Sequence, residues 1–262
     1  LGFIGSRLAI RLVDCGATVT ILDNLAPDTG ANRYNAAAIE GRATIHIGDI
    51  RDRDTVVRLV RNQDVILNLA ALIAHMDSMR QPVEDLDVNA RAQLVILDAC
   101  REVNPAVRIV HASTRQVYGR AEHVPVAEDH PTRPTDVNGV NKLAGELFYM
   151  LYHQVYGTRA TVVRLTNTFG PGMRIRDGRQ TFIGVWLRAL VEGTRFEVWG
   201  GDQIRDLVFV EDVVDAFCAA ALSDNALGEV FNVGGAEPIS LRRLAERLIE
   251  VNGGGACAVI PY

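Results

Sequence analysis

The stretch LGFIGSRLAIRLVDCGATVTILD, residues 1–23, decides the expected fold. Its first part has apolar side chains at helical spacing, and its last part is a β-branched run that ends in Asp23. Gly2 would let the backbone approach a pyrophosphate, and Gly5 would let the helix pack closely on a sheet. Two glycines alone could mark a simple turn. A carboxylate about 20 residues further on, at the end of a strand, strengthens the prediction of a dinucleotide-binding unit.

The cofactor predicted from these residues is NAD. Asp23 can accept hydrogen bonds from both ribose hydroxyls of an adenosine, and its charge would repel the extra phosphate of NADP. Asp49 ends the following strand, where it could reach the adenine amino group or cap the next helix. Small residues at 68–72 would let the backbone pass beneath the cofactor. The cofactor-binding residues predicted in this part of the chain are Gly2, Phe3, Ile4, Gly5, Asp23, Asn24, Asp49, Ile50, Leu69, Ala70 and Ala71.

Short β-branched runs alternate with longer amphipathic ones over the first two thirds of the chain. The strand-like runs are nearly continuously apolar, as in a parallel sheet that is covered on both faces. They lie at 17–23, 43–49, 64–70, 106–113 and 160–166, with helices expected at 3–16, 51–62, 83–102 and 138–156. This alternation predicts an α/β protein with a Rossmann-type, doubly wound parallel sheet.

After about residue 167 the pattern loosens, and Gly, Pro and Arg become frequent. The elements expected here are helices at 181–193, 212–222 and 240–251 and strands at 196–199, 206–210 and 229–233. We therefore predict an NAD-binding domain at 1–166 and a smaller C-terminal α/β lobe, mainly substrate-binding, at 167–262. Because the chain opens inside a motif and without Met, we expect its first strand and first glycine upstream of Leu1, and further residues after Tyr262.

The composition is that of an ordinary globular enzyme, with 48% hydrophobic and 23% charged residues. A net charge of −5 gives no general attraction to nucleic acid or to an anionic membrane. No apolar run approaches the roughly 20 residues that span a bilayer. The cysteines lack metal-ligand or C-x-x-C spacing, so we expect buried reduced thiols, no metal site and a cytoplasmic location. These cysteines are Cys15, Cys100, Cys218 and Cys257.

Taken together, the motifs resemble those of the extended short-chain dehydrogenase/reductase family, in particular its NAD-dependent nucleotide-sugar epimerases and dehydratases. The resemblance extends from Leu1 to about Val251. Each motif alone would be weak, whereas the set is specific. The set consists of GFIG (2–5), ILDNL (21–25), GDIRD (48–52), NLAA (68–71), AST..VYG (112–119), NKLAGE (141–146), RLTNTFGPG (164–172) and RDLVFVEDVV (205–214).

The resemblance implies roles for five residues. Thr114 matches a residue that hydrogen-bonds the sugar hydroxyl undergoing oxidation, and Lys142 matches the lysine that holds the nicotinamide ribose. Asn167 matches an asparagine that reaches the substrate. Arg205 matches the arginine that clamps the diphosphate of a sugar nucleotide, a task suited to a bidentate guanidinium. Arg174 would assist there or lie in a solvated basic loop.

Two departures from the family pattern bear on the chemistry. Arg115 and Gln116 stand where 4,6-dehydratases carry an acid pair, which counts against that reaction. Asn138 stands where relatives carry the catalytic tyrosine, four residues before Lys142. A neutral amide cannot carry a proton near pH 7. Asn138 is therefore the catalytic position whose chemistry the sequence leaves open.

Several groups could carry the proton instead. Thr114 could relay it through water or a ribose hydroxyl toward Lys142. Tyr118 follows the same strand, although a packing role suits it as well. His75 follows the 68–71 segment and titrates near neutral pH, although it could be a surface loop residue. His111 lies within a strand and is expected to be a satisfied core residue.

The sequence therefore predicts an NAD-dependent nucleotide-sugar epimerase, similar to UDP-glucose 4-epimerase, that works through a transient keto-sugar. NAD would supply the hydride chemistry and the protein the geometry. The alternatives are a catalytically impaired or regulatory homologue that binds NAD and a nucleotide sugar, an engineered substitution at Asn138 that traps substrate, and another family reaction such as a decarboxylase or reductase. The base, the sugar and the carbon attacked stay open.

The predicted partners are a nucleoside-diphosphate sugar and a second copy of the chain. The helices at 83–102 and 138–156 carry more apolar residues than one sheet face can bury. In the family, these helices pair across a two-fold axis, so we expect a homodimer. Substrate specificity is expected in the loops at 75–82 and 172–182.

Overall fold

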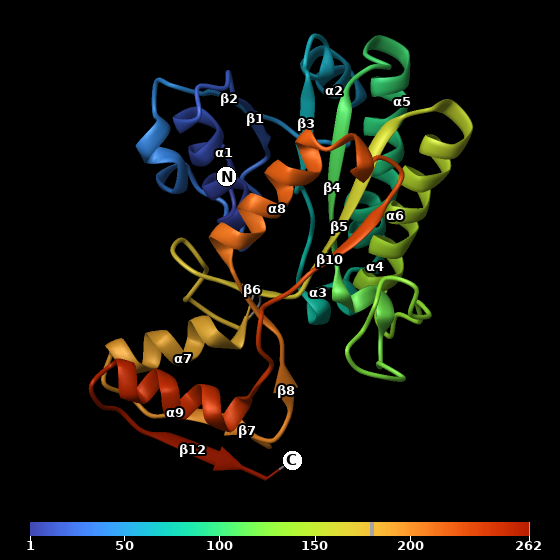
Figure 1. Ribbon diagram of the computed structural model, residues 1–262. Helices are drawn as coiled ribbons and strands as arrows, with labels where there is room; N and C mark the ends of the chain where they lie inside the picture. The colour runs from blue at the N-terminus through green and yellow to red at the C-terminus, as the bar shows by residue number, and fades with distance from the viewer. Residues whose placement is uncertain (179–180, 262) are drawn as a thin grey trace.

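The computed structural model describes residues 1–178 and 181–261 and shows two lobes (Figure 1). The larger lobe contains parallel strands with helices on both faces, and the smaller lobe lies below it. Two of the residues in the predicted specificity loop at 172–182, namely 179 and 180, lie outside the described chain. The C-terminal end lies in the smaller lobe, far from the N-terminal end (Figure 1).

The main sheet has four parallel strands in the order β10-β5-β4-β3. A second pair, β1 with β2, is also parallel. In the described chain, no backbone pairing joins β1 to β3, so the facing edges of the two sheets are open. The strands are β1 (Thr20–Asp23), β2 (Thr44–Ile47), β3 (Val65–Asn68), β4 (Arg108–Thr114), β5 (Arg159–Leu165) and β10 (Val230–Val233).

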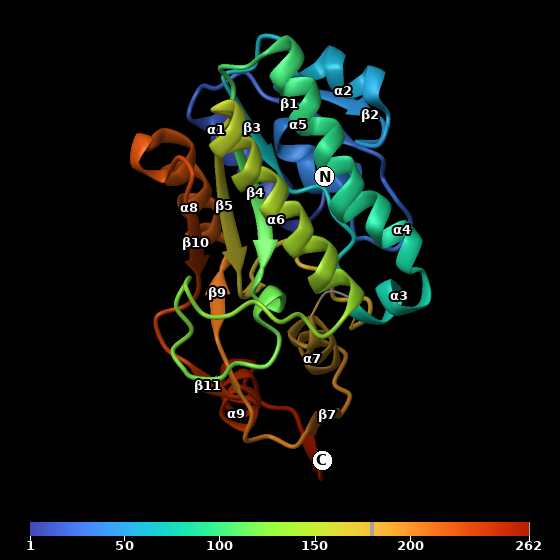
Figure 2. The same ribbon diagram turned by 90° about the vertical axis from the view of Figure 1, so that its right-hand side faces the viewer.

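Successive residues of the central strands face opposite layers of helices, as the pleat of a strand requires. Ile109 and Val162 pack with one layer, and Val110 and Val163 pack with the other. The first layer is α2 (Arg53–Val60), α5 (Ala92–Val103) and α6 (Val137–Tyr156); the second is α1 (Phe3–Asp14) and α8 (Val210–Leu222). Figure 2 shows α5 and α6 lying side by side across the strands. The predicted Rossmann-type parallel α/β fold is confirmed.

The segment predicted as a helix at 83–102 is helical without a break, but it is not α-helical throughout. It consists of α4 (Pro82–Leu86), a π-helical turn η2 (Asp87–Arg91) and α5. In the π-helical turn, the side chain of Asn89 accepts a hydrogen bond from the Leu72 N–H at 3.2 Å and donates to the Leu72 carbonyl at 2.9 Å. The irregular turn therefore ties this helix to the segment that follows β3.

The smaller lobe has its own apolar core, built mainly from α7 (Phe182–Val191), α9 (Leu241–Val251) and β7 (Phe196–Trp199). The strand β12 (Cys257–Ile260), which the sequence pattern did not predict, runs parallel to β7. Two short pairs lie between this core and the main sheet: β6 (Asn167–Phe169) with β9 (Leu207–Phe209), and β8 (Ile204–Arg205) with β11 (Ile239–Ser240). The strand predicted at 206–210 is confirmed as β9, whereas β8, just before it, was not predicted.

The chain returns to the larger lobe after residue 166. Helix α8 packs on the main sheet through Val213, Val214 and Phe217, and β10 pairs with β5. The boundary at 166 stays a prediction, but the segment 210–233 lies with the first lobe. Further short elements are η1 (Arg33–Ile39), α3 (His75–Arg80), η3 (Arg115–Tyr118) and η4 (Asp224–Ala226).

The four cysteines are free thiols, but they are not uniformly buried. Cys100 is buried, Cys218 and Cys257 are half-buried, and Cys15 is exposed at the end of α1. The prediction of buried thiols is therefore wrong for Cys15, which is the C-cap residue just after α1. Among the described helices, none has the combination of length and apolar character needed to cross a bilayer.

Candidate active site

The N-terminal end of α1 is open and lacks a side-chain cap. Gly2 is the N-cap residue, and no side-chain hydrogen bond satisfies the first N–H groups of the helix. A Cβ atom at Gly2 or Gly5 would meet no described atom within 4 Å. Phe3 is buried and Ile4 is half-buried. An uncapped helix start beside open space suits an anion such as a pyrophosphate, whereas the expected close packing of Gly5 on a strand is absent among the described residues.

Asp23 lies at the carboxyl end of β1, where the sequence placed it. Its carboxylate accepts a hydrogen bond from the Leu25 N–H at 2.7 Å, and its Oδ2 lies 2.6 Å from the main-chain nitrogen of Leu1. The side chain is 19% exposed. The carboxylate therefore stands beside the glycine-rich start of α1, which is the arrangement that a dinucleotide site requires.

Asp49 is held by its own turn. It accepts three hydrogen bonds from the backbone and guanidinium of Arg51 and one from the amide of Asn24. The hydrogen bond from Arg51 is the main cause that lowers the pKa of Asp49. The cap of α2 is Asp52, so the alternative role of Asp49 as a helix cap is wrong. Ile50 packs against the core between the sheet and α2.

Lys142 is buried on α6 against the end of β4. Its Nζ donates to the carbonyl of Ala112 at 2.7 Å, two residues before Thr114 on the same strand. Burial is the main cause that lowers its pKa to about 8, while Glu146 and Asp85 oppose that shift. The structure thus fixes Lys142 against the strand that ends at Thr114. The predicted segment Leu69, Ala70 and Ala71 follows β3, the neighbouring strand, and all three residues are half-buried.

Asn138 is 2% exposed, and its amide is engaged within the protein. Its Nδ2 donates to the Leu72 carbonyl at 2.7 Å and to Asp85 at 3.0 Å. The second carboxylate oxygen of Asp85 accepts from Asn141 at 2.9 Å. Asn138 therefore fastens the start of α6 to α4 and to the segment after β3.

His75, expected in a loop, begins the short helix α3. Its Nδ1 lies 2.6 Å from Asp136, and its Nε2 lies 2.5 Å from the side-chain nitrogen of Gln116. Gln116 in turn donates its backbone N–H to Thr114 Oγ1 at 3.3 Å. This chain of contacts leads from His75 to the end of β4.

Two other predicted proton carriers have structural positions. Tyr118 is 4% exposed; its hydroxyl donates to Asn232 at 2.7 Å and accepts from Arg164 at 2.7 Å. His111 is fully buried and stacks on Tyr149 with ring centroids 4.5 Å apart. Neither ring nitrogen of His111 has a hydrogen-bond partner in the described chain, so it is a core residue but not a satisfied one. Burial, followed by the charge of Lys142, lowers its pKa.

Positive charge gathers across from Thr114. Asn167, at the start of β6, accepts from the Arg115 guanidinium at 3.5 Å and donates to the Asp206 carbonyl at 3.0 Å. The Arg115 side chain is exposed, but its pKa is lowered. The main cause is partial desolvation by the surrounding protein, followed by the charge of Arg205, whereas the charge of Asp206 raises the pKa. Two mutually repelling guanidinium groups favour a bound anion.

Arg174 is placed differently. Its guanidinium donates to Asp177 at 2.9 and 2.5 Å and lies 3.6 Å from Asp28. Its side chain is only 9% exposed. The structure therefore shows Arg174 joining its own loop to the loop after β1, rather than beside Arg115 and Arg205.

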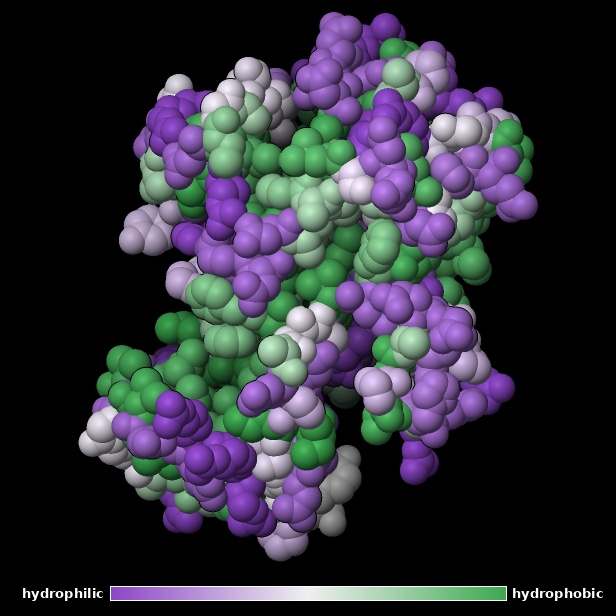
Figure 3. Space-filling view, in the orientation of Figure 1, coloured by the Kyte–Doolittle hydropathy of each residue, from purple (hydrophilic) through white to green (hydrophobic). Residues whose placement is uncertain are grey.

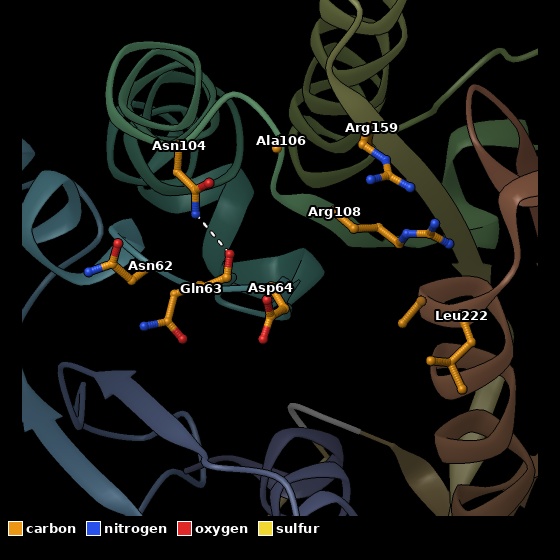
Figure 4. Close-up of a pocket in the computed structure, with 9 residues that line it drawn as sticks. Asn62, Gln63, Asp64, Asn104, Ala106, Arg108, Arg159 and Leu222 are labelled. Carbon is orange, nitrogen blue, oxygen red and sulfur yellow. Dashed lines mark hydrogen bonds between the residues drawn. The ribbon is translucent and has the colours of Figure 1, made fainter.

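A cavity of about 670 Å³ lies at the opposite, amino end of the strands (Figure 4). Arg108 and Arg159 from its wall both pair with Asp224. Ligands of open parallel sheets bind beyond the carboxyl ends of the strands, so we do not assign the active site here. In the described residues, no group of three or more His, Cys, Asp or Glu side chains is arranged to hold a metal ion.

Sequence reasoning missed Asp85, Ser78 and Asp136. Asp136 carries the clearest signal, because an Asp just before an amphipathic helix is a typical N-cap, and it accepts from the Gly139 N–H at 2.7 Å. Its second partner, His75, is 61 residues away in the sequence. Asp85 sits among surface-type residues in the sequence, and nothing there indicates that it is 1% exposed.

Comparison with known proteins agrees with this geometry. Residues 1–234 match the NAD dependent epimerase/dehydratase family. A UDP-glucose 4-epimerase of Mycolicibacterium smegmatis is 32% identical over 246 residues, covering 93% of this chain and 77% of the relative. A dTDP-glucose 4,6-dehydratase of Streptomyces griseus is 32% identical over 260 residues, covering 96% and 76%.

A solved structure of the Thermus thermophilus UDP-glucose 4-epimerase, in complex with NAD, superimposes with a TM-score of 0.87. It is 28% identical, and the alignment covers 99% of this chain and 84% of that one. The fold agrees with that of this relative. The chain belongs to the NAD-dependent epimerase/dehydratase family of extended short-chain dehydrogenases/reductases.

Proposed function

We propose that the protein is an NAD-dependent nucleotide-sugar epimerase, similar to UDP-glucose 4-epimerase. The observation that carries this proposal is buried Lys142, whose Nζ donates to the Ala112 carbonyl at the end of β4, two residues before Thr114. Arg115 follows Thr114, and the charge of Arg205 contributes to lowering its pKa. Thr114 would bind a sugar hydroxyl, and the arginines would bind the diphosphate. A site with both features suits a sugar nucleotide better than a free sugar.

The residues present fit NAD. The open helix start at Gly2 and Gly5 would take the pyrophosphate, and Asp23 would take the adenosine ribose. Lys142 keeps two N–H groups beyond the one bound to Ala112, and these would hold the nicotinamide ribose. When bound, NAD supplies a two-electron acceptor that takes a hydride from the sugar and returns it.

In this proposal the NAD site would also include the remaining predicted cofactor residues, which are Phe3, Ile4, Asn24, Asp49, Ile50 and Leu69 to Ala71. Asn24 and Asp49 are joined by a hydrogen bond of 3.0 Å, which fixes both side chains beside the ribose position. Asn167 would contact the substrate. Arg174 would act indirectly, by holding its loop against Asp28.

Epimerisation is favoured over 4,6-dehydration because Arg115 and Gln116 provide no carboxylate after Thr114. Asn138 does not substitute for a tyrosine, since its amide has no acidic proton and both its donors are used. A second candidate function is a regulatory protein that binds NAD and a nucleotide sugar without turnover. The engagement of Asn138 inside the protein favours that candidate, because no group then stands at the usual tyrosine position.

We also propose a homodimer that is formed through α4, α5 and α6. Helix α6 exposes an apolar stripe at Val140, Leu147, Leu151 and Val155, each at least 50% exposed. These residues lie on one face at helical spacing, and apolar stripes of this kind mark interfaces. Light scattering at micromolar concentration should give twice the chain mass, and a monomer would contradict the proposal. A cytoplasmic location is part of the proposal and is supported by the four free thiols.

The test is direct. Calorimetry should show NAD and UDP binding, and incubation with UDP-glucose should yield UDP-galactose by chromatography. A panel of other nucleotide sugars would identify the substrate if UDP-glucose is not turned over. Binding of both ligands with no turnover of any sugar would favour the regulatory candidate. Binding of neither NAD nor any sugar nucleotide would overturn the proposal.

A further inference from the structure

Three side chains from three separate elements meet beside the end of β4. His75 comes from the first turn of α3, Asp136 precedes α6, and Gln116 lies in η3. The imidazole lies between the other two, with Nδ1 2.6 Å from the Asp136 carboxylate and Nε2 2.5 Å from the Gln116 side-chain nitrogen. A carboxylate–imidazole–amide chain of this kind orients the ring at both nitrogens.

Asp136 fixes where the imidazole proton sits. One of its oxygens accepts from the Gly139 N–H at 2.7 Å and caps α6, and the other faces His75 Nδ1. A carboxylate only accepts hydrogen bonds, so neutral His75 carries its proton on Nδ1. Its Nε2 then has a lone pair that accepts from the Gln116 amide. The tautomer follows from these partners.

Gln116 can serve both charge states of the ring. Its Oε1 is buried and has no hydrogen-bond partner in the described chain. A half-turn of the amide would bring Oε1 to the place of its nitrogen, where it would accept from a protonated Nε2. The amide thus donates to neutral His75 or accepts from the imidazolium. A group that takes up and returns a proton needs a neighbour with this property.

His75 is also placed to reach a substrate. Its side chain is 48% exposed, and Gln116 links it to Thr114 through the 3.3 Å hydrogen bond. Other charged groups lie on the elements packed against α3 or on α3 itself. They are Glu84 and Asp85 on α4, Lys142 on α6, Asp136 before α6, Arg115 on η3, and Asp77 and Arg80 on α3. Of these, Asp136 is in hydrogen-bond contact with the imidazole.

We propose that His75, oriented by Asp136, carries the proton that a tyrosine carries in relatives; this inference rests on the proposed function. As the sugar carbon is oxidised, with NAD as the two-electron oxidant, the Gln116 amide turns away from Nε2 of neutral His75, the hydroxyl O–H bond breaks, and its proton passes to the lone pair that this frees. When the keto group is reduced on its other face, the imidazolium returns that proton to the oxygen. No net proton or electron is gained over the cycle.

The first test needs no cofactor or substrate. Protein labelled with ¹⁵N-histidine should show the Nδ1–H tautomer for His75 at neutral pH by imidazole NMR, with His75→Gln assigning the signal and His46→Gln as a control. In Asp136→Asn, the amide oxygen still caps α6, but its NH₂ now faces Nδ1. The proton should then move to Nε2. An Nε2–H tautomer in the parent protein would overturn the proposed role of Asp136.

The second test uses turnover of the sugar nucleotide. His75→Gln should lower kcat at least about 100-fold, within the range for loss of a general base, and abolish the acid limb of the pH profile. KM and the affinity for NAD should change less than about threefold. The reason is that Gln is similar in size to His, and the substitution removes a group that acts in the transition state and not in substrate binding. Asp136→Asn should also lower kcat while the fold is retained, because the inverted tautomer carries its proton on Nε2, which then cannot accept one from the sugar.

The outcomes separate the two proposals. If the parent turns over a sugar and His75→Gln stays within about threefold of it, the proton carrier is wrong and the epimerase proposal stands. If the parent turns over no sugar, the epimerase proposal fails, and the proposed role of His75 as proton carrier fails as well. If His75→Gln is impaired but Asp136→Asn is fully active with an inverted tautomer, the orienting role of Asp136 is wrong.

Discussion

Replacing Asn138 by tyrosine would restore the family sequence but not, we expect, the family chemistry. Asn138 is 2% exposed and donates to the Leu72 carbonyl and to Asp85. A tyrosine cannot make both bonds, because it has a single O–H placed several ångströms further from the backbone. The substitution would leave the half-buried Leu72 carbonyl with Asn89 as its donor and Asp85 with the amide of Asn141 alone.

The expected cost follows from these contacts. Loss of a neutral hydrogen bond costs about 0.5–1.5 kcal/mol, and loss of one to a charged group costs about 1.5–3 kcal/mol. Forcing a larger side chain into a filled site adds about 1–3 kcal/mol. The sum is about 3 kcal/mol or more, a large share of the roughly 5–15 kcal/mol that stabilises a typical protein. For a chain of this size, it would lower Tm by about 6 °C or more.

Urea denaturation of Asn138→Tyr and of the parent would measure this difference. Gln154→Tyr is the matched control, because it adds the same ring on the exposed last turn of α6 and should change stability by no more than about 0.5 kcal/mol. Sugar-nucleotide turnover by Asn138→Tyr should not exceed that of the parent. A variant that is as stable as the parent, and more active, would refute the structural role assigned to Asn138.

Three further outcomes are expected. Gly2→Ala should keep the unfolding free energy within about 0.5 kcal/mol of the parent, because the added Cβ meets no described atom within 4 Å. It should nevertheless weaken NAD binding at least about tenfold, as measured by calorimetry. Equal affinity for NAD would contradict the pyrophosphate site. Between pH 8 and 10.5, Lys142 has lost its proton in the folded protein but keeps it in the unfolded chain. Across that window the unfolding free energy of the parent, measured by denaturation, should therefore rise by up to about 3 kcal/mol relative to Lys142→Met. A difference between the two that does not change with pH would show that the lysine is not desolvated. Glu146→Gln should lower the unfolding free energy by about 3–5 kcal/mol, because it leaves the buried guanidinium of Arg164 without its charge partner. The double variant with Arg164→Met should recover part of that stability. If the costs of the two substitutions simply add, the pairing is wrong.

The sheet and its main site residues were predictable because their signals are local. The apolar strands, the glycine-rich start of α1 and the carboxylate of Asp23 follow one another within a short stretch of chain. Thr114 and Lys142 came from motifs of the family, and the structure places Lys142 against Ala112 on the strand that ends at Thr114. The expected strand before Leu1 and the boundary at 166 stay predictions.

What sequence reasoning missed depends on contacts between distant residues. Asp85 lies 53 residues before Asn138, and no periodic pattern links an acidic residue on one helix to an amide on another. The π-helical turn near Asn89 is fixed by its hydrogen bonds to Leu72, not by local propensity. The role of Gly5 stays a prediction, because no described atom lies within 4 Å of a Cβ built there.

The return of the chain to the larger lobe limits how the cleft between the lobes can open (Figure 3). The polypeptide passes between the lobes three times: from β5 to β6, from β9 to α8, and from β10 to β11. A lobe attached by one connection could swing freely, whereas three separate tethers must bend together. Entry and exit of a ligand should therefore involve a small sliding of the lower lobe, and a single cut in the chain at 166 would leave both halves joined through α8 and β10.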